Sequence, residues 1–193
     1  MGGMLAHAAL TLSLIVRLYD TYGVPDRTLA SARASVNQIM ASTGIRVTWP
    51  ECPCDRAVGG SELLVRIVAA PASSGPELLG FSYIDVAHKA GTLATVFADR
   101  VHALAQASGA NDGELLGRAM AHEIVHLLLG THAHTESGLM RAHWTFTPSG
   151  VPEHSSDWML SRKEGDAIRR ALSRRAPAAV LADSQPESLT ASP

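Results

Sequence analysis

Alternating apolar and polar residues at the start of the chain predict a β-α-β unit. Residues 10–18 alternate almost strictly, which is the period of a half-buried strand. Asp26 can cap a helix whose apolar residues fall on one stripe and which Gly44 ends. Residues 45–49 then alternate again. A strand, a helix and a strand in this order indicate a right-handed parallel crossover.

The middle of the chain predicts the rest of the sheet. Residues 63–68 are dense in branched side chains, which favours a third strand. Residues 78–86 and 92–97 predict two shorter strands that pair with each other or flank the edge of the sheet. An exposed edge strand is where an extended peptide can add itself by main-chain hydrogen bonds.

Three further helices are expected in the second half of the chain. Residues 98–107 have helical apolar spacing. Asn111 and Glu114 match the pattern of an N-cap with a capping box, for a helix that runs to Leu129. Apolar neighbours on several sides predict that this helix is buried centrally against the sheet. Residues 161–174 open with a second capping pair and predict a C-terminal helix.

Together these elements predict an α+β fold. We expect a mixed, mostly parallel twisted sheet with an antiparallel edge strand, packed on a central helix and a C-terminal helix. A chain of 193 residues is one domain of ordinary size, which we place at residues 1–175. Residues 176–193 are small, polar and interrupted by proline, so they predict a disordered tail.

Composition and charge narrow the range of partners. The net charge is −2 and no long basic run argues for a nucleic-acid partner. The first sixteen residues lack an early Lys or Arg, and His7, Thr11 and Ser13 interrupt their apolar run. They therefore predict neither a signal peptide nor a membrane span. Cellular location stays open, because export would be possible for a chain that has lost a leader.

The candidate chemistry lies on the central helix. His122, Glu123 and His126 have H-E-x-x-H spacing, so both imidazoles leave the same helix face about 5 to 6 Å apart at Cβ. That separation lets two nitrogens share one zinc ion at roughly 2.0 to 2.1 Å each. Glu123 lies beside the open side of the metal, where it can take a proton from a zinc-bound water.

A catalytic zinc usually has three protein ligands, and two histidines can supply the third. Gly130 can adopt positive φ and end the helix, after which the chain can return beneath the metal. His132 is only two residues beyond Gly130, which leaves little chain with which to return to the metal. We therefore favour His134, with His132 as the alternative. Met140 follows in Gly-Leu-Met, which can form a tight turn with an apolar floor.

This stretch resembles the metzincin clan of zinc metallopeptidases. The pattern of that clan is H-E-x-x-H-x-x-G-x-x-H followed by a methionine-containing turn. His132 matches the last histidine by spacing and Met140 matches the turn, but Leu129 stands where the glycine is expected and Gly130 comes one residue late. The resemblance implies a peptide substrate seated along an antiparallel edge strand above the active-site helix. No tyrosine follows Tyr83, so the tyrosine that some metzincins place after the methionine turn is absent.

The sequence thus predicts a zinc-dependent metalloendopeptidase that hydrolyses peptide bonds through a Glu-activated, zinc-bound water. The alternative is a zinc-containing peptide- or protein-binding module without significant turnover, because a displaced third ligand could close the site. Zinc-dependent amide hydrolysis on a non-peptide substrate is a third possibility.

Several other residues remain as weaker candidates. His143 and His154 are extra ligands or ordinary loop histidines, and the second reading is favoured. Trp144 either lines the pocket or fills the core. Cys52 and Cys54 are too close for an unstrained disulfide, so two free thiols in a turn are favoured over a metal clip or a thiolate that blocks the zinc.

Overall fold

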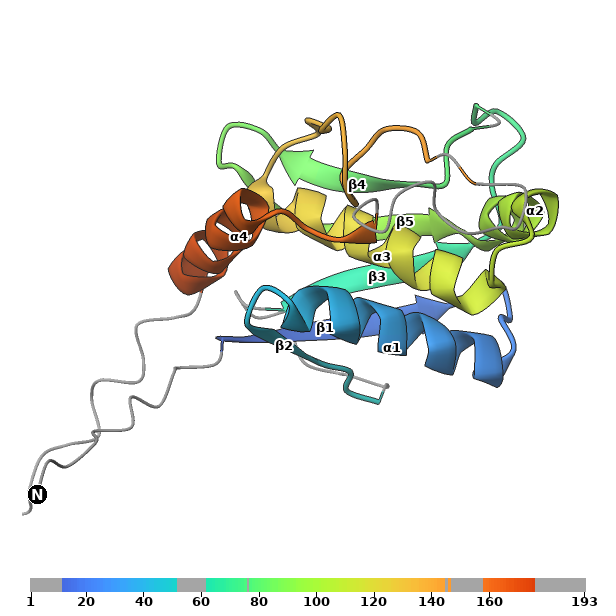
Figure 1. Ribbon diagram of the computed structural model, residues 1–193, viewed down its shortest axis with the longest axis horizontal. Coiled ribbons are helices and arrows are strands. Elements are labelled where there is room, and N and C mark those ends of the chain that lie inside the picture. The colour runs from blue at the N-terminus through green and yellow to red at the C-terminus, as the bar shows by residue number, and fades with distance from the viewer. Residues whose placement is uncertain (1–11, 52–61, 76, 145, 147–157, 176–193) are drawn as a thin grey trace, which may run out of the picture.

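A five-stranded sheet forms one layer of the molecule (Figure 1). The computed structural model describes residues 12–51, 62–75, 77–144, 146 and 158–175. The strands are β1 (Leu12–Asp20), β2 (Ile45–Thr48), β3 (Glu62–Val68), β4 (Gly80–Asp85) and β5 (Ala90–Phe97). Their order is β2-β1-β3-β5-β4, with β4 antiparallel to β5 and every other pair parallel. β4 is therefore an edge strand, as the sequence predicts.

Four helices accompany the sheet, namely α1 (Asp26–Ala41), α2 (Ala98–Ser108), α3 (Asp112–Leu129) and α4 (Arg162–Arg175). The predicted α+β class, with its mostly parallel sheet, antiparallel edge strand and C-terminal helix, is confirmed. One detail differs, because Asp26 does not cap α1. Pro25 occupies the cap position and Asp26 is the first helical residue, where its charge favours the helix N-terminus.

Some predictions fall outside the described residues. They concern residues 176–193, for which the sequence predicts a disordered tail, the two cysteines Cys52 and Cys54, and His154. Within the part of the chain that the structure describes, no helix combines the length and apolarity needed to cross a membrane.

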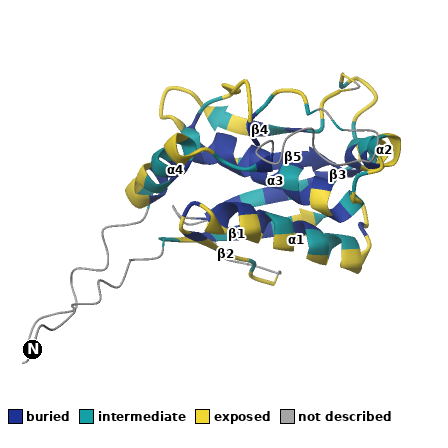
Figure 2. Cartoon of the chain, viewed as in Figure 1, coloured by how far each residue is buried: buried dark blue, intermediate teal, exposed yellow. Residues whose placement is uncertain are grey.

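Helix α3 is the centre of the core. Fourteen of its eighteen residues are buried, as expected for a helix enclosed by other elements. It lies beside α1 over one face of the sheet, and Figure 2 shows dark blue buried residues in both helices. From α1 a single stripe packs inward, consisting of Ala32, Val36, Ile39 and Met40. Burial of each large apolar side chain contributes roughly 1.5 to 3 kcal/mol.

Both ends of α3 are defined by specific contacts. At the start, the Asn111 side chain accepts a hydrogen bond from the Glu114 N–H at 3.0 Å. At the end, Gly130 adopts the left-handed conformation with φ 62°, and its N–H donates to the His126 carbonyl at 2.9 Å. Arg175 of α4 also donates to the Leu127 carbonyl, so the C-terminal helix is tied to this turn. The helix therefore reaches Leu129, as predicted.

Substitution of Gly130 by Ala tests the turn that ends α3. A Cβ there would meet the backbone of Lys89 at 2.2 Å, and the positive φ disfavours any L side chain. We expect Gly130→Ala to lower the free energy of unfolding by at least about 2 kcal/mol, measured by urea denaturation. Gly75→Ala is the matched control, since no atom lies within 4 Å of the added Cβ. Equal stability of the two variants would contradict this account of the turn.

Candidate metal centre

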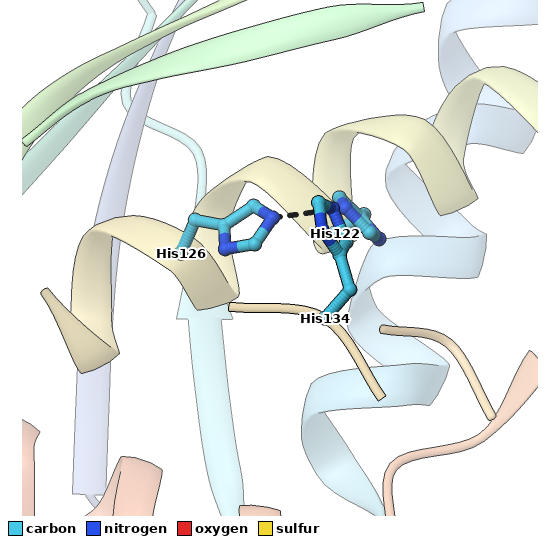
Figure 3. A group of neighbouring side chains, drawn as sticks. All are labelled: His122, His126 and His134. Carbon is cyan, nitrogen blue, oxygen red and sulfur yellow. Dashed lines mark hydrogen bonds between the residues drawn. The ribbon is translucent and has the colours of Figure 1, made fainter. Parts of the chain in front are cut away.

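Three histidine side chains converge beside the buried helix α3. His122 and His126 lie one turn apart on the helix, and His134 comes from the loop that follows it. Their ligand atoms all lie within 4.8 Å of one another. Figure 3 shows the His126 ring directed toward the stacked rings of His122 and His134, with ring centroids 5.2 Å apart in the stacked pair. The grouping can hold a metal ion.

The protonation pattern of the two helical histidines follows from their backbone partners. His122 Nδ1 lies 2.9 Å from the Leu139 carbonyl, and His126 Nδ1 lies 2.7 Å from the Thr131 carbonyl. A carbonyl oxygen only accepts, so each Nδ1 must carry the proton and donate it. In a neutral ring the other nitrogen, Nε2, then presents a bare lone pair.

These two lone pairs face each other. The Nε2 atoms of His122 and His126 are 3.0 Å apart. Burial lowers the pKa of His126 to about 4, helped by the charge of His122, and burial also lowers the pKa of His122. Neither ring therefore carries a second proton at neutral pH, and two acceptors in contact repel. A cation held by both nitrogens removes the repulsion, and ligands of one tetrahedral zinc lie about 3.3 Å apart. The residues present fit a metal ion.

His134, rather than His132, completes the group. The His134 ring lies 5.0 Å from the His126 ring, whereas the His132 ring lies 6.3 Å from it and its nitrogens fall outside the three-histidine group. Burial lowers the pKa of His134, and the charges of His143 and His132 act in the same direction. His134 is exposed, so its side chain can rotate toward the other two nitrogens. Helix α3 ends at Leu129, one residue later than the metzincin pattern implies, and the grouping of His134 with the two helical histidines agrees with this later turn.

The loop after α3 also forms the predicted turn at residues 138–140. The Thr135 N–H donates to the Met140 carbonyl at 2.9 Å, and the Leu139 N–H donates to the Met159 carbonyl at 3.0 Å. Leu139 and Met140 are both buried. The Gly-Leu-Met segment thus forms a turn with two buried apolar side chains, and the Leu139 carbonyl of this turn contacts His122.

Glu123 lies beside the histidines in a restricted position. It is buried, and the Ser82 hydroxyl lies 2.7 Å from Oε2 and 2.8 Å from the Glu123 carbonyl oxygen. Burial raises the pKa of Glu123 to about 7, and the hydrogen bond from Ser82 opposes this shift. On the neighbouring strand, a Cβ at Gly80 would lie 3.2 Å from the Glu123 carboxylate and 2.6 Å from the Thr95 carbonyl. Glycine there leaves room for the carboxylate.

Trp144 plays both of the roles considered for it. Its indole N–H donates to the Leu139 carbonyl at 3.2 Å, which is the same oxygen that accepts from His122. Trp144 lines the cavity, and its ring also packs against Trp158 with centroids 5.0 Å apart. His143 is exposed at the cavity mouth, 3.7 Å from a Glu77 carboxylate oxygen.

The histidines and Glu123 open into a cavity of about 770 Å³. This size lies within the range of small-molecule and peptide-side-chain sites. The walls come from residues 77–82, the α2 face that includes Leu104, and one face of α3. The following loop adds His132, His134 and residues 141–144. The candidate metal centre therefore shares one open space with the edge strand β4.

The sequence analysis did not identify Ser82 and Gly80 as part of the site. For Ser82, the strand pattern contained an indication. Strand β4 alternates between buried and more exposed positions, and Ser82 is a polar residue at a buried position. A buried hydroxyl needs a partner, which here is Glu123. The backbone carbonyls of Thr131 and Leu139, which orient the two helical histidines, could not be predicted from the types of their side chains.

Comparison with protein-family models gives no match, and comparison with curated proteins gives none either. The likeness to the metzincins therefore rests on the motif and its setting.

Replacement of single histidines distinguishes the third ligand. His134→Ala should weaken zinc binding by at least about 100-fold. Loss of even a group that only hydrogen-bonds to a metal ligand lowers metal affinity about 10- to 100-fold. His132→Ala, two residues away in the same loop, should leave the affinity nearly unchanged. Competition with a chelating dye measures both. The opposite ranking of the two variants would assign the third position to His132.

Proposed function

We propose that this protein is a zinc-dependent metalloendopeptidase. The observation that carries the proposal is the contact of two bare Nε2 lone pairs, with Glu123 in the same cavity. His122, His126 and His134 would hold the zinc, and three protein ligands leave the fourth position open, as in catalytic rather than structural sites. When bound there, zinc would polarise a carbonyl and lower the pKa of water.

Glu123 supplies the proton transfers. Its carboxylate lies one residue from a helical ligand and lines the cavity that a substrate would enter. We assign it as the group that takes a proton from the attacking water and then passes a proton to the leaving amine. Ser82 acts as a positioning residue, because its hydroxyl fixes the carboxylate from the opposite wall.

Strand β4 is the proposed seat for the substrate. It is the edge of the sheet, and its first residues and the segment before it line the cavity. An extended peptide can pair with such an edge through main-chain hydrogen bonds, while its side chains enter the adjoining pocket. That arrangement brings a peptide bond past Glu123 and the three histidines.

Glu123→Gln separates metal binding from hydrolysis. The zinc-loaded protein is incubated with a diverse peptide library, and mass spectrometry identifies the cuts. We expect the variant to retain zinc and to lose about 10²- to 10⁴-fold in rate, since the amide cannot accept the proton. Glu114→Gln, an exposed change on the same helix, is the control. If the unaltered protein makes no metal-dependent cuts at saturating zinc, the peptide-binding module is the better description.

Ser82→Ala tests the positioning of Glu123. Loss of a hydrogen bond to a charged group should lower turnover by at least about tenfold without changing zinc content. Ser82→Thr, which keeps a hydroxyl, should recover part of the rate. Ser35→Ala, on α1 and outside the cavity, is expected to behave like the unaltered protein. Turnover in Ser82→Ala equal to that of Ser35→Ala would exclude the positioning role.

A further inference from the structure

The cavity extends beyond the histidines along one face of α2. Arg100, Ala103, Leu104 and Ala107 line it with the spacing of a single helix face. This wall is about 10 Å long at 1.5 Å per residue. Small side chains at Ala103 and Ala107 keep it open, and Arg100 provides its one strong charge. The proton transfers assigned to Glu123 do not require this part of the cavity, so it is available for recognition.

The guanidinium of Arg100 is held in place by neutral groups. Nη1 donates to the Gly75 carbonyl, and Nη2 donates to the Ser74 carbonyl and the Ser74 hydroxyl, each at 3.1 Å. Across the described residues it forms no ion pair. Because a guanidinium has five N–H groups, these contacts leave donors available. A half-buried, pre-oriented arginine without a counter-charge can bind a carboxylate through these donors.

Two other charged side chains near this part of the cavity do not replace that counter-charge. Glu77 is 79% exposed and lies 3.7 Å from His143. Its charge is therefore screened by solvent and has a partner of its own. Arg141, which also lines the cavity, is itself a cation and cannot supply the counter-charge. Beside Arg100, an anionic group is consequently favoured over a cationic one.

The direction of β4 indicates which part of a substrate reaches Arg100. Strand β4 begins where β5 ends and α2 begins, since Gly80 pairs with Val96, and it runs away from α2 (Figure 1). A peptide added antiparallel to β4 would therefore reach α2 with its C-terminal end. A parallel peptide would bring its amino end, which Arg100 would repel. Antiparallel pairing is also slightly more stable per residue.

We propose that Arg100 binds a carboxylate of the substrate on the C-terminal side of the cleaved bond. In this arrangement, an apolar side chain of the substrate would lie along the α2 wall between the histidines and Arg100. The carboxylate comes either from the C-terminus of a short peptide or from an acidic side chain, and both present the same group to the guanidinium. This proposal rests on the proposed zinc hydrolase and makes Arg100 its specificity-determining residue.

Binding of hydroxamate-capped peptides tests this assignment without relying on turnover. The hydroxamate stands at the amino end, so that each peptide extends toward α2 from the metal. Three probes are compared by calorimetry on the zinc-loaded full chain: Leu-Ala with a free carboxylate, Leu-Ala amide and Leu-Glu amide. We expect at least one carboxylate probe to bind about tenfold more tightly than Leu-Ala amide. A gain for Leu-Ala with a free carboxylate identifies the peptide C-terminus as the group that Arg100 binds. A gain for Leu-Glu amide identifies an acidic side chain.

Variants assign the gain to Arg100. Arg100→Gln should abolish the carboxylate preference, and Arg100→Lys, which keeps the charge, should retain part of it. Ser74→Ala removes one neutral contact of Arg100 and should leave the preference intact. A preference that survives in Arg100→Gln would overturn the assignment.

Acetohydroxamic acid separates this inference from the proposed function. It engages the metal alone and should bind every variant equally. In a separate titration, acetohydroxamic acid can bind while all three peptide probes bind the unaltered protein with equal affinity. That result would overturn the role of Arg100 and leave the proposed metal centre intact. Failure of acetohydroxamic acid to bind the zinc-loaded protein would overturn both.

Discussion

The site depends on two backbone carbonyls that accept hydrogen bonds from buried imidazoles. Thr131 and Leu139 fix the Nδ1 proton of His126 and His122, and the opposite nitrogens are thereby left as facing acceptors. Burial keeps both rings neutral. The resulting repulsion is a cost of folding that a bound cation converts into attraction. One loop provides both carbonyls and also His134, so its conformation sets the whole donor group.

Rigidity around this loop comes from the centre of the core. Helix α3 is buried along most of its length, and α4 is anchored to its last turn through Arg175. On the other side of the cavity, Ser82 and Gly80 belong to a strand paired within the sheet. The groups that would meet a substrate are therefore carried by paired or enclosed backbone, which suits chemistry that needs fixed geometry.

Periodicity and capping residues predicted the architecture well, because burial patterns are local in the sequence. The strands, the extent of α3 and the H-E-x-x-H face follow from that information. The preference for His134 came from the position of Gly130, and the three-histidine group agrees with it. By contrast, Ser82 and Glu123 are separated by forty-one positions in the sequence. The two carbonyls that orient the histidines are backbone groups, which every residue has, so no residue type marks them. Such long-range or main-chain partners leave little trace in composition. Asp26 was assigned to the cap because the pattern does not distinguish a cap from a first turn preceded by proline.

The close approach of Gly130 to Lys89 has a consequence for how this protein can vary. Lys89 itself has a positive φ of 49°, so two left-handed residues meet where the β4–β5 hairpin crosses the end of α3. Hairpin tips are ordinarily tolerant of insertion and exchange. Here the tip abuts the turn that sends the chain back toward the histidines. Changes in hairpin length would therefore be transmitted to the loop that carries His134, and among homologous chains the two segments should change together.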